Sequence, residues 1–153
     1  MLLVLVLPLP LFLHAYVVDA LLNISVDDVS PLITYTGQWE PSATHMSSLD
    51  FGGSHTLSSD PDARATFNFT GVAVYYLAPR WPYAVSTHLS LDGGPPAFVN
   101  LTDPFSSTTP PGGSESAPFS VAWFAADLAN TSHTVVATMG NYIIVDGFMC
   151  VRV

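Results

Sequence analysis

The stretch RATFNFTGVAVYYLAPRWPYAVSTHLSLDGG, residues 64–94, decides the fold class. Apolar and polar side chains alternate over 65–70, and over 72–77 Val72, Val74 and Tyr76 alternate with Ala73, Tyr75 and Leu77; this two-residue period is typical of strands with one buried face. Thr70-Gly71 predicts a tight hairpin turn that pairs these two strands, because glycine tolerates the positive φ that such a turn requires. A third alternating strand over 85–91 is followed by a turn signal. The stretch therefore predicts antiparallel β-structure.

Short strands and turns fill the rest of the chain, and long helices are not expected. The segment 78–83 carries two prolines, which remove ladder donors, so we expect a connection there. Residues 103–118 are rich in proline, glycine and serine and predict a long loop. Further strands are expected at 24–26, 33–35, 38–39, 55–57, 97–101, 119–125, 133–139 and 142–153, the last interrupted at Asp146-Gly147. The predicted fold class is an all-β, antiparallel two-sheet β-sandwich.

Composition bounds the domain count and the class of partner. The chain has 153 residues, enough for one domain with a two-layer core. Arg64, Arg80 and Arg152 are its three strong bases against 12 acidic residues, for a net charge of −9. Nucleic-acid binding is excluded because it requires clustered basic residues. The acidity also repels anionic membranes, so a neutral glycan or another protein is the expected partner.

The N-terminus predicts export. Residues 1–20 are largely apolar and end in Val18-Asp19-Ala20, a small-residue pattern that signal peptidase accepts after Ala20. The alternative is an uncleaved membrane anchor, although two prolines and Asp19 make a poor spanning helix. We therefore expect a signal peptide over 1–20, a single mature domain over 21–153, and a secreted protein at the cell surface or wall.

Two further features concern the exported chain. Cys150 is the single cysteine and lies in an apolar strand pattern, so we expect a buried thiol. Four Asn-X-Ser/Thr triplets without proline predict N-glycosylation, at Asn23, Asn68, Asn100 and Asn130.

The order of short motifs supports a family resemblance. VDD, ITYTGQW, SHTLSS, ATFNFTGVAVYYL, LSLDGG and a closing VDGF strand resemble galactose-binding-like jelly-roll ectodomains of fungal secreted or membrane-anchored surface proteins. That resemblance covers nearly all of 25–153 and implies a carbohydrate-binding-module-like sandwich with variable loops at one end. In many relatives a transmembrane helix follows, so the resemblance suggests either a stand-alone secreted copy or a truncated membrane-anchored form.

Loop aromatics and nearby polar residues are the candidate ligand site. A sugar ring binds a flat aromatic face, and its hydroxyl groups bind a few polar side chains. The alternative is that the tryptophans only fill the ends of the sandwich. The candidate residues are Trp39, Glu40, His45, Asp50, Trp81 and Tyr83.

The sequence also offers candidate residues for a metal site and for catalysis. Asp27, Asp28 and Asp146 lie near the first and last strands and would suit Ca²⁺, but turn formation explains them equally well. No other cofactor is expected. The histidines His45, His55, His88 and His133 lack metal-site spacing and are expected to be structural or exposed. No GxSxG elbow occurs, and the only glutamates are Glu40 and Glu115, so we expect no catalysis.

The sequence therefore predicts a non-catalytic glycan-binding or adhesive module. One alternative is a structural or interaction ectodomain without sugar specificity, and a more distant one is an exported hydrolase. Trp81 and Tyr83 separate the first two, because they should form an exposed planar face in a glycan-binding module and be buried in a purely structural ectodomain.

Overall fold

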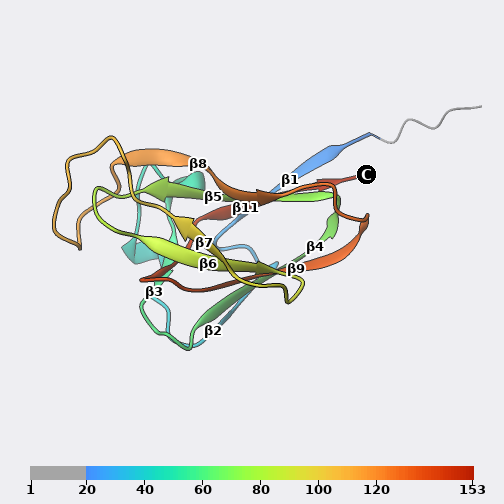
Figure 1. Ribbon diagram of the computed structural model, residues 1–153, viewed down its shortest axis with the longest axis horizontal. Helices are drawn as coiled ribbons and strands as arrows, with labels where there is room; N and C mark the ends of the chain where they lie inside the picture. The colour runs from blue at the N-terminus through green and yellow to red at the C-terminus, as the bar shows by residue number, and fades with distance from the viewer. Residues whose placement is uncertain (1–19) are drawn as a thin grey trace, which may run out of the picture.

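A computed structural model describes residues 20–153, so the predicted signal peptide lies outside the described residues except for Ala20. Two antiparallel sheets pack face to face (Figure 1). One sheet has the order β1 (Leu22–Asp27), β11 (Gly147–Arg152), β5 (Ala73–Arg80), β8 (Ala117–Ala125). The other has the order β2 (Ile33–Thr36), β4 (Arg64–Gly71), β9 (Thr131–Met139), β6 (Ser86–Leu91), β7 (Ala97–Asn100). The predicted all-β sandwich is confirmed.

Short elements complete the domain. β3 (Thr56–Ser58) pairs with β10 (Ile143–Val145), and two 3-10 turns, η1 (Ser42–Thr44) and η2 (Phe51–Gly53), lie in the segment before β3. No helix within residues 20–153 is long and apolar enough to cross a membrane.

Aromatic side chains join the two sheets in the core. Phe67 of β4 stacks on Phe148 of β11 with ring centroids 4.8 Å apart, and Tyr76 of β5 packs beside the same ring at 5.5 Å. The Tyr76 hydroxyl donates to the Ile144 carbonyl at 2.8 Å, which satisfies a polar group at complete burial. Cys150 is buried in this core, as expected.

The predicted hairpin between β4 and β5 is wrong. The two strands belong to different sheets, and the chain crosses the sandwich between them at Val72. The Val72 N–H donates to the Val151 carbonyl at 2.8 Å, and a Cβ on Gly71 would collide with that same carbonyl. Gly71 is therefore explained by close backbone approach at a sandwich corner rather than by a tight turn.

The connection predicted over 78–83 is also wrong in part, because β5 continues through Pro79 to Arg80. Ala78 pairs with Ser120 and Arg80 pairs with Ala117, and the register shifts between these pairs at Pro79. A bulge leaves one residue unpaired, so proline is tolerated there without loss of a ladder bond.

Two other strand predictions change. The predicted closing strand divides at Asp146 into β10 and β11, which lie in different sheets, so Asp146 marks a second crossing point. Residues 38–39 form no strand, and the neighbouring Glu40 makes only an isolated bridge to Leu57.

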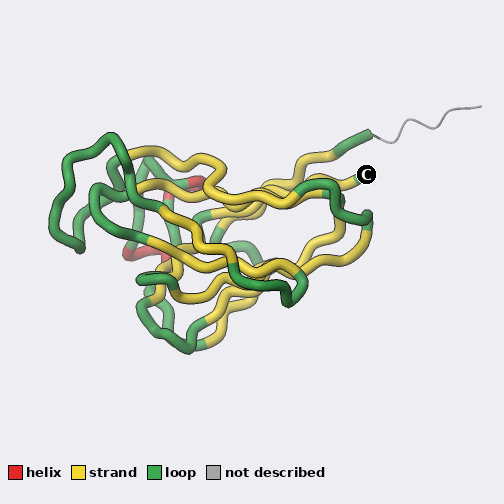
Figure 2. Tube along the Cα trace, in the orientation of Figure 1, coloured by secondary structure: helices red, strands yellow, loops and turns green. Residues whose placement is uncertain are grey.

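The long loops gather at the end of the sandwich away from the C-terminus (Figure 2).

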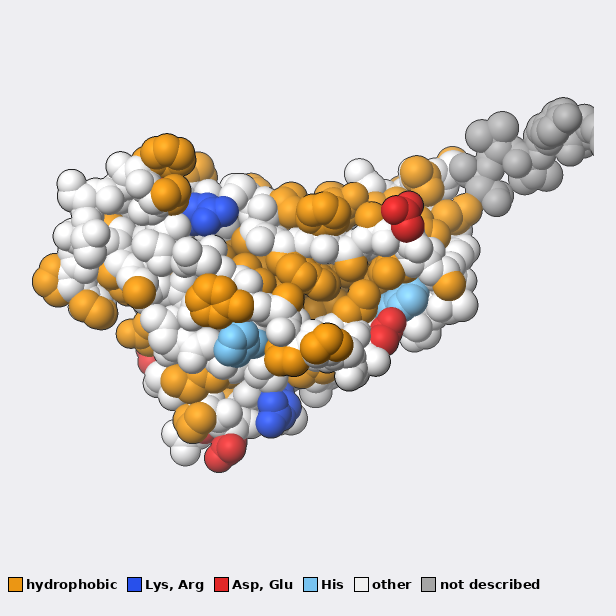
Figure 3. All heavy atoms as spheres, in the orientation of Figure 1, with side chains coloured by type: hydrophobic (Ala, Val, Ile, Leu, Met, Phe, Trp, Pro, Cys, Tyr) orange, Lys and Arg blue, Asp and Glu red, His pale blue; other side chains and the backbone are white. Residues whose placement is uncertain are grey.

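One open side of the sandwich is apolar. On the face in Figure 3, hydrophobic side chains are visible in the hollow between the two layers. β7 and β8 each form one of the two edges of their sheet, and they carry the exposed side chains Phe98, Phe119, Val121 and Phe124.

Candidate functional site

A cavity of about 340 Å³, here called the loop-end pocket, opens among the loops at the end of the sandwich. Carboxylates and imidazoles line it together with aromatic and aliphatic side chains, a mixture typical of small-ligand sites. Its walls come from five segments of the chain. The lining residues are Glu40, Thr44, His45, Met46, His55, Leu57, Trp81, Tyr83, Val85, Gly112, Gly113, Ser114, Glu115, Tyr142 and Ile144.

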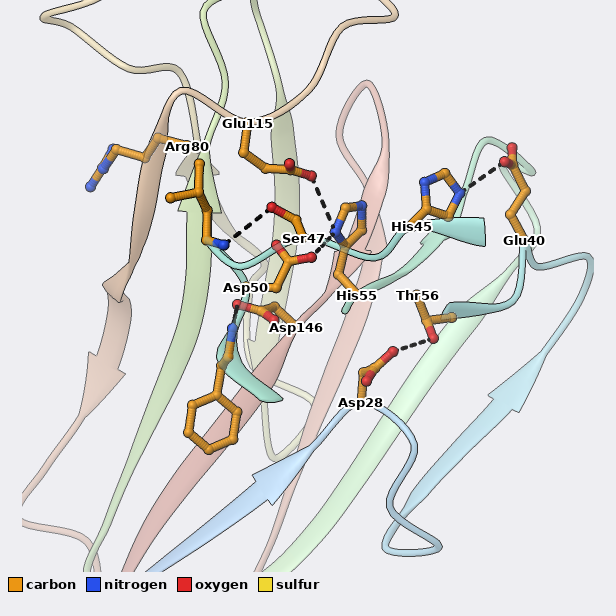
Figure 4. Close-up of polar contacts among 12 residues, drawn as sticks. Asp28, Glu40, His45, Ser47, Asp50, His55, Thr56, Arg80, Glu115 and Asp146 are labelled. Atoms are coloured by element: carbon orange, nitrogen blue, oxygen red, sulfur yellow. Dashed lines mark hydrogen bonds and ion pairs between the residues drawn. The ribbon is translucent and has the colours of Figure 1, made fainter. Parts of the chain in front are cut away.

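His55 contacts two carboxylates in the wall of the pocket (Figure 4). Its Nδ1 lies 2.9 Å from Asp50 Oδ2 and 3.4 Å from Glu115 Oε1. The side-chain exposures of His55, Asp50 and Glu115 are 3%, 0% and 8%. Burial raises the pKa of Asp50, and the His55 hydrogen bond and charge oppose that rise. Asp50 thus lies behind the pocket wall and holds His55 in place.

A second histidine extends this cluster toward solvent. The His45 ring stacks on His55 with centroids 5.0 Å apart, and His45 Nε2 lies 3.0 Å from Glu40 Oε2. Glu40 is half exposed, at 56%. The structure therefore brings together Glu40, His45 and Asp50, as the sequence analysis grouped them.

Trp81 and Tyr83 do not form the exposed aromatic face that a stacking sugar platform would need. The two residues are 3% and 7% exposed and belong to the core. The Trp81 backbone is held on both sides, because its N–H donates to Leu101 and its carbonyl accepts from Asp103. The Tyr83 hydroxyl donates to the Gly113 carbonyl at 2.7 Å. These aromatics close the pocket wall and offer no flat platform for a ring.

Trp39 lies outside the loop-end pocket. It packs edge-on against Tyr35 at 4.8 Å, and its indole N–H donates to the Thr36 carbonyl. It lines a separate hollow with Gln38, Glu40, Ser58, Ser59 and Asp60. Of the two loop tryptophans, Trp39 is the less buried.

Asp27, Asp28 and Asp146, which the sequence offers either as Ca²⁺ ligands or as turn-forming residues, surround the strand-crossing region. Asp28 and Asp146 have no exposed surface. Thr56 Oγ1 donates to Asp28 Oδ2 at 2.7 Å, and the Phe51 N–H donates to Asp146 Oδ2 at 3.1 Å. The Oδ1 atoms of Asp27, Asp28 and Asp146 are buried without a hydrogen-bond partner within residues 20–153.

These aspartates do not converge as a ready-made calcium site. In the described part of the chain, a single group of three or more potential ligands has all its ligand atoms within 4.8 Å, and it is Asp50, His55 and Glu115. Burial instead raises the pKa of Asp146 to about 8, with the nearby carboxylates adding to the rise and the Phe51 bond opposing it. At neutral pH the Asp146 carboxyl therefore holds a proton, and Ca²⁺ binding by this trio stays a prediction.

The pairing of His55 with Glu115 was not predicted from the sequence. His55 was expected to be structural or exposed, and Glu115 was expected to lie in an unpacked loop. The two residues are 60 positions apart, since the pocket forms only when the loop before β8 folds back. Glu115 and Asp103 are the only charged residues of the predicted loop 103–118, and this was the signal that could have drawn attention to Glu115.

The four predicted glycosylation positions all lie at the surface. Each asparagine is exposed, as glycan attachment requires. Asn68 lies in β4, where its side-chain oxygen accepts from the Thr134 hydroxyl at 2.7 Å. Glycosylation itself stays a prediction.

The fold occurs within several carbohydrate-active enzymes. No family model and no curated protein matches the chain. An exo-β-1,3-galactanase from Phanerochaete chrysosporium matches 85% of the chain and 29% of its own length, with a TM-score of 0.55 and 16% identity. A family two carbohydrate esterase from Cellvibrio japonicus matches 88% of the chain and 35% of its own, with a TM-score of 0.54 and 10% identity. A Paenibacillus xanthan lyase matches 86% and 13%, with a TM-score of 0.53 and 14% identity.

These likenesses concern the fold. The chain covers 29%, 35% and 13% of those three enzymes, so in each it corresponds to a portion of a much longer protein. At these identities the comparison shows a shared β-sandwich, and function has to be argued from the site.

Proposed function

We propose that this protein is a non-catalytic glycan-binding or adhesive module, secreted and acting at a fungal cell surface or wall, and that the loop-end pocket is its ligand site. The pocket carries this proposal because it combines carboxylates and imidazoles with an apolar wall in one cavity.

The chemistry of the pocket suits a neutral sugar. Carboxylates accept hydrogen bonds from hydroxyl groups, and charged acceptors form the stronger bonds. Glu40 and Ser114 are exposed, whereas the apolar edges of Trp81 and Tyr83 lie deeper in the wall. A volume of about 340 Å³ is at the lower end of the range for small-molecule sites. We therefore expect recognition of one terminal sugar unit by polar contacts rather than by stacking.

The neighbours and the charge agree with this class of partner. The galactanase, esterase and lyase with this fold are carbohydrate-active proteins. A net charge of −9 disfavours anionic polymers. In the described residues no hydroxyl group hydrogen-bonds to His55, whose ring is held by Asp50, so we propose binding rather than acyl transfer.

A second candidate is an interaction ectodomain without sugar specificity. The burial of Trp81 and Tyr83 favours it, as do the exposed apolar side chains along β7 and β8. Large exposed apolar patches mark protein contacts. In this case the loop-end pocket would have no ligand, and the edge strands would carry the function.

A glycan array separates the two candidates. The full chain, expressed in a secreting host, is compared with Glu40→Gln and His45→Ala, which change the exposed rim of the pocket. Asp62→Asn is the matched control, because it neutralises an exposed carboxyl that does not line the pocket. Loss of a charged hydrogen bond costs about 1.5–3 kcal/mol, or roughly a tenfold to hundredfold loss of affinity.

The expected result is selective binding that falls at least tenfold in both rim variants and is unchanged in Asp62→Asn. Absence of binding by the folded protein, or binding that both rim variants retain, contradicts a glycan site in this pocket.

A further inference from the structure

Two buried carboxylates compete for one ring nitrogen beside the loop-end pocket. His55 Nδ1 lies 2.9 Å from Asp50 and 3.4 Å from Glu115. A ring nitrogen carries at most one proton, and the geometry directs the hydrogen bond to Asp50. Glu115 makes no hydrogen bond within residues 20–153 although its side chain is only 8% exposed.

Asp50 is also incompletely satisfied. Its Oδ1 is buried without a hydrogen-bond partner in the described part of the chain. A buried carboxylate with a free acceptor is costly unless a cation compensates it. The cluster thus contains two carboxylates, Asp50 and Glu115, that His55 alone does not satisfy.

The charge balance favours a dication over an imidazolium. Protonated His55 beside Asp50 and Glu115 leaves one net negative charge, whereas neutral His55 with a divalent ion leaves none. The Asp28 carboxyl group also interacts electrostatically with His55, whereas Asp146 holds a proton at neutral pH and adds no charge. Figure 4 shows Asp50 between His55 and Asp146.

The spacing fits a shared ion. All three ligand atoms lie within 4.8 Å of one another. Two ligands each about 2.1 Å from one ion at a tetrahedral angle are about 3.4 Å apart, which is the separation of His55 Nδ1 and Glu115 Oε1. The 2.9 Å between His55 Nδ1 and Asp50 Oδ2 is a hydrogen-bond distance, so binding an ion requires this bond to break and Asp50 to move by roughly half an ångström.

We propose that Asp50, His55 and Glu115 bind one divalent transition-metal ion, with Zn²⁺ as the first candidate. One imidazole and two carboxylates are borderline ligands that suit Zn²⁺ better than the all-oxygen shell preferred by Ca²⁺. His55 and Glu115 line the loop-end pocket, so the remaining coordination position of the ion opens toward it. This site is distinct from the predicted calcium site and does not depend on glycan binding.

Metal titration tests the assignment. The full chain is stripped with EDTA, and Zn²⁺ binding is measured by calorimetry while Co²⁺ reports coordination geometry by its visible absorption. Glu115→Gln removes one ligand from a loop position, and Asp50→Asn removes another. Asp62→Asn is the control, and circular dichroism establishes that each variant is folded.

The expected result is one ion per chain, with at least tenfold weaker binding in Glu115→Gln and Asp50→Asn and unchanged binding in Asp62→Asn. Three results overturn the proposal. The first is that the folded wild type binds neither Zn²⁺ nor Co²⁺. The second is that both ligand variants bind as tightly as the wild type. The third is loss of binding in Glu40→Gln alone, which would place the ion on His45 and Glu40.

Discussion

Replacing Asp146 by asparagine should remove much of the pH dependence of stability. Asp146 is fully buried at the crossing between β10 and β11, and its pKa is raised to about 8. Asparagine keeps the shape of the side chain and an oxygen that accepts the Phe51 N–H. The substitution therefore removes the ionisation with little change in packing.

The size of the effect follows from linkage. The unfolded carboxyl loses its proton near pH 3.9, whereas the folded one keeps it to about pH 8. The native state thus binds more protons between these values, and its free energy of unfolding falls as pH rises. One pKa unit corresponds to about 1.4 kcal/mol, so wild type loses up to about 4 kcal/mol between pH 4 and pH 7. The Asp146→Asn variant should not show this loss.

Urea unfolding followed by tryptophan fluorescence measures the difference. Both proteins are compared at pH 4.5, 6, 7 and 8 in EDTA, with Asp62→Asn as an exposed-carboxyl control. We expect the variant to be more stable than wild type at pH 7 and 8 and similar at pH 4.5. Equal pH slopes for the two proteins would refute protonation of Asp146. A less stable variant at pH 7, together with wild type stabilised by added Ca²⁺, would instead support the predicted calcium site.

Two other predictions concern the sandwich itself. Gly71→Ala should reduce the free energy of unfolding by about 1 to 3 kcal/mol in urea, because the new Cβ meets the Val151 carbonyl; an unchanged unfolding midpoint would contradict this. Asp92→Asn should destabilise the protein near pH 5 and much less at pH 8. The reason is that the Ala129 carbonyl and Asp92 raise the pKa of His133 in the folded protein. The stabilisation from protonated His133 is therefore present below pH 6.5 and is lost as pH rises through the pKa of folded His133. Thermal unfolding at both pH values checks it, and an equal loss at pH 5 and 8 would argue against this role of His133.

The strand positions could be predicted from the sequence because alternation is a local property. Phe67 and Phe69 alternate with polar residues in β4, and all the apolar positions of that strand are buried. The pairing could not be predicted in the same way. A glycine between two strands fits a hairpin and a crossing equally well, and the close approach of Val151 to Gly71 depends on a strand 80 residues away.

The expectation that the two prolines exclude a strand over 78–83 failed for a similar reason. Pro79 excludes a regular ladder position, but the bulge in β5 removes the need for a donor there. The split of the last strand at Asp146 was signalled by Asp146-Gly147, although the sequence did not show that the two halves enter different sheets.

The candidate site was predictable only in part. Glu40, His45 and Asp50 fall within 11 residues, so proximity in the chain brought them together. Glu115 joins them through the folding of a long loop, which no local pattern encodes. For Trp81 the sequence left two alternatives open, an exposed platform on a loop and a buried plug of the sandwich end; its backbone bonds to Leu101 and Asp103 hold it in the core.

The most direct test of glycan binding in the loop-end pocket uses the three indole N–H signals as reporters. An oligosaccharide selected on the array is titrated into ¹⁵N-labelled protein. Trp81 lines the loop-end pocket, Trp39 lines a separate hollow and Trp123 lies in β8. Binding in the loop-end pocket predicts a saturable shift of the Trp81 signal while the Trp39 and Trp123 signals stay in place. A shift confined to Trp39 or Trp123, or no shift at saturating sugar, would contradict it.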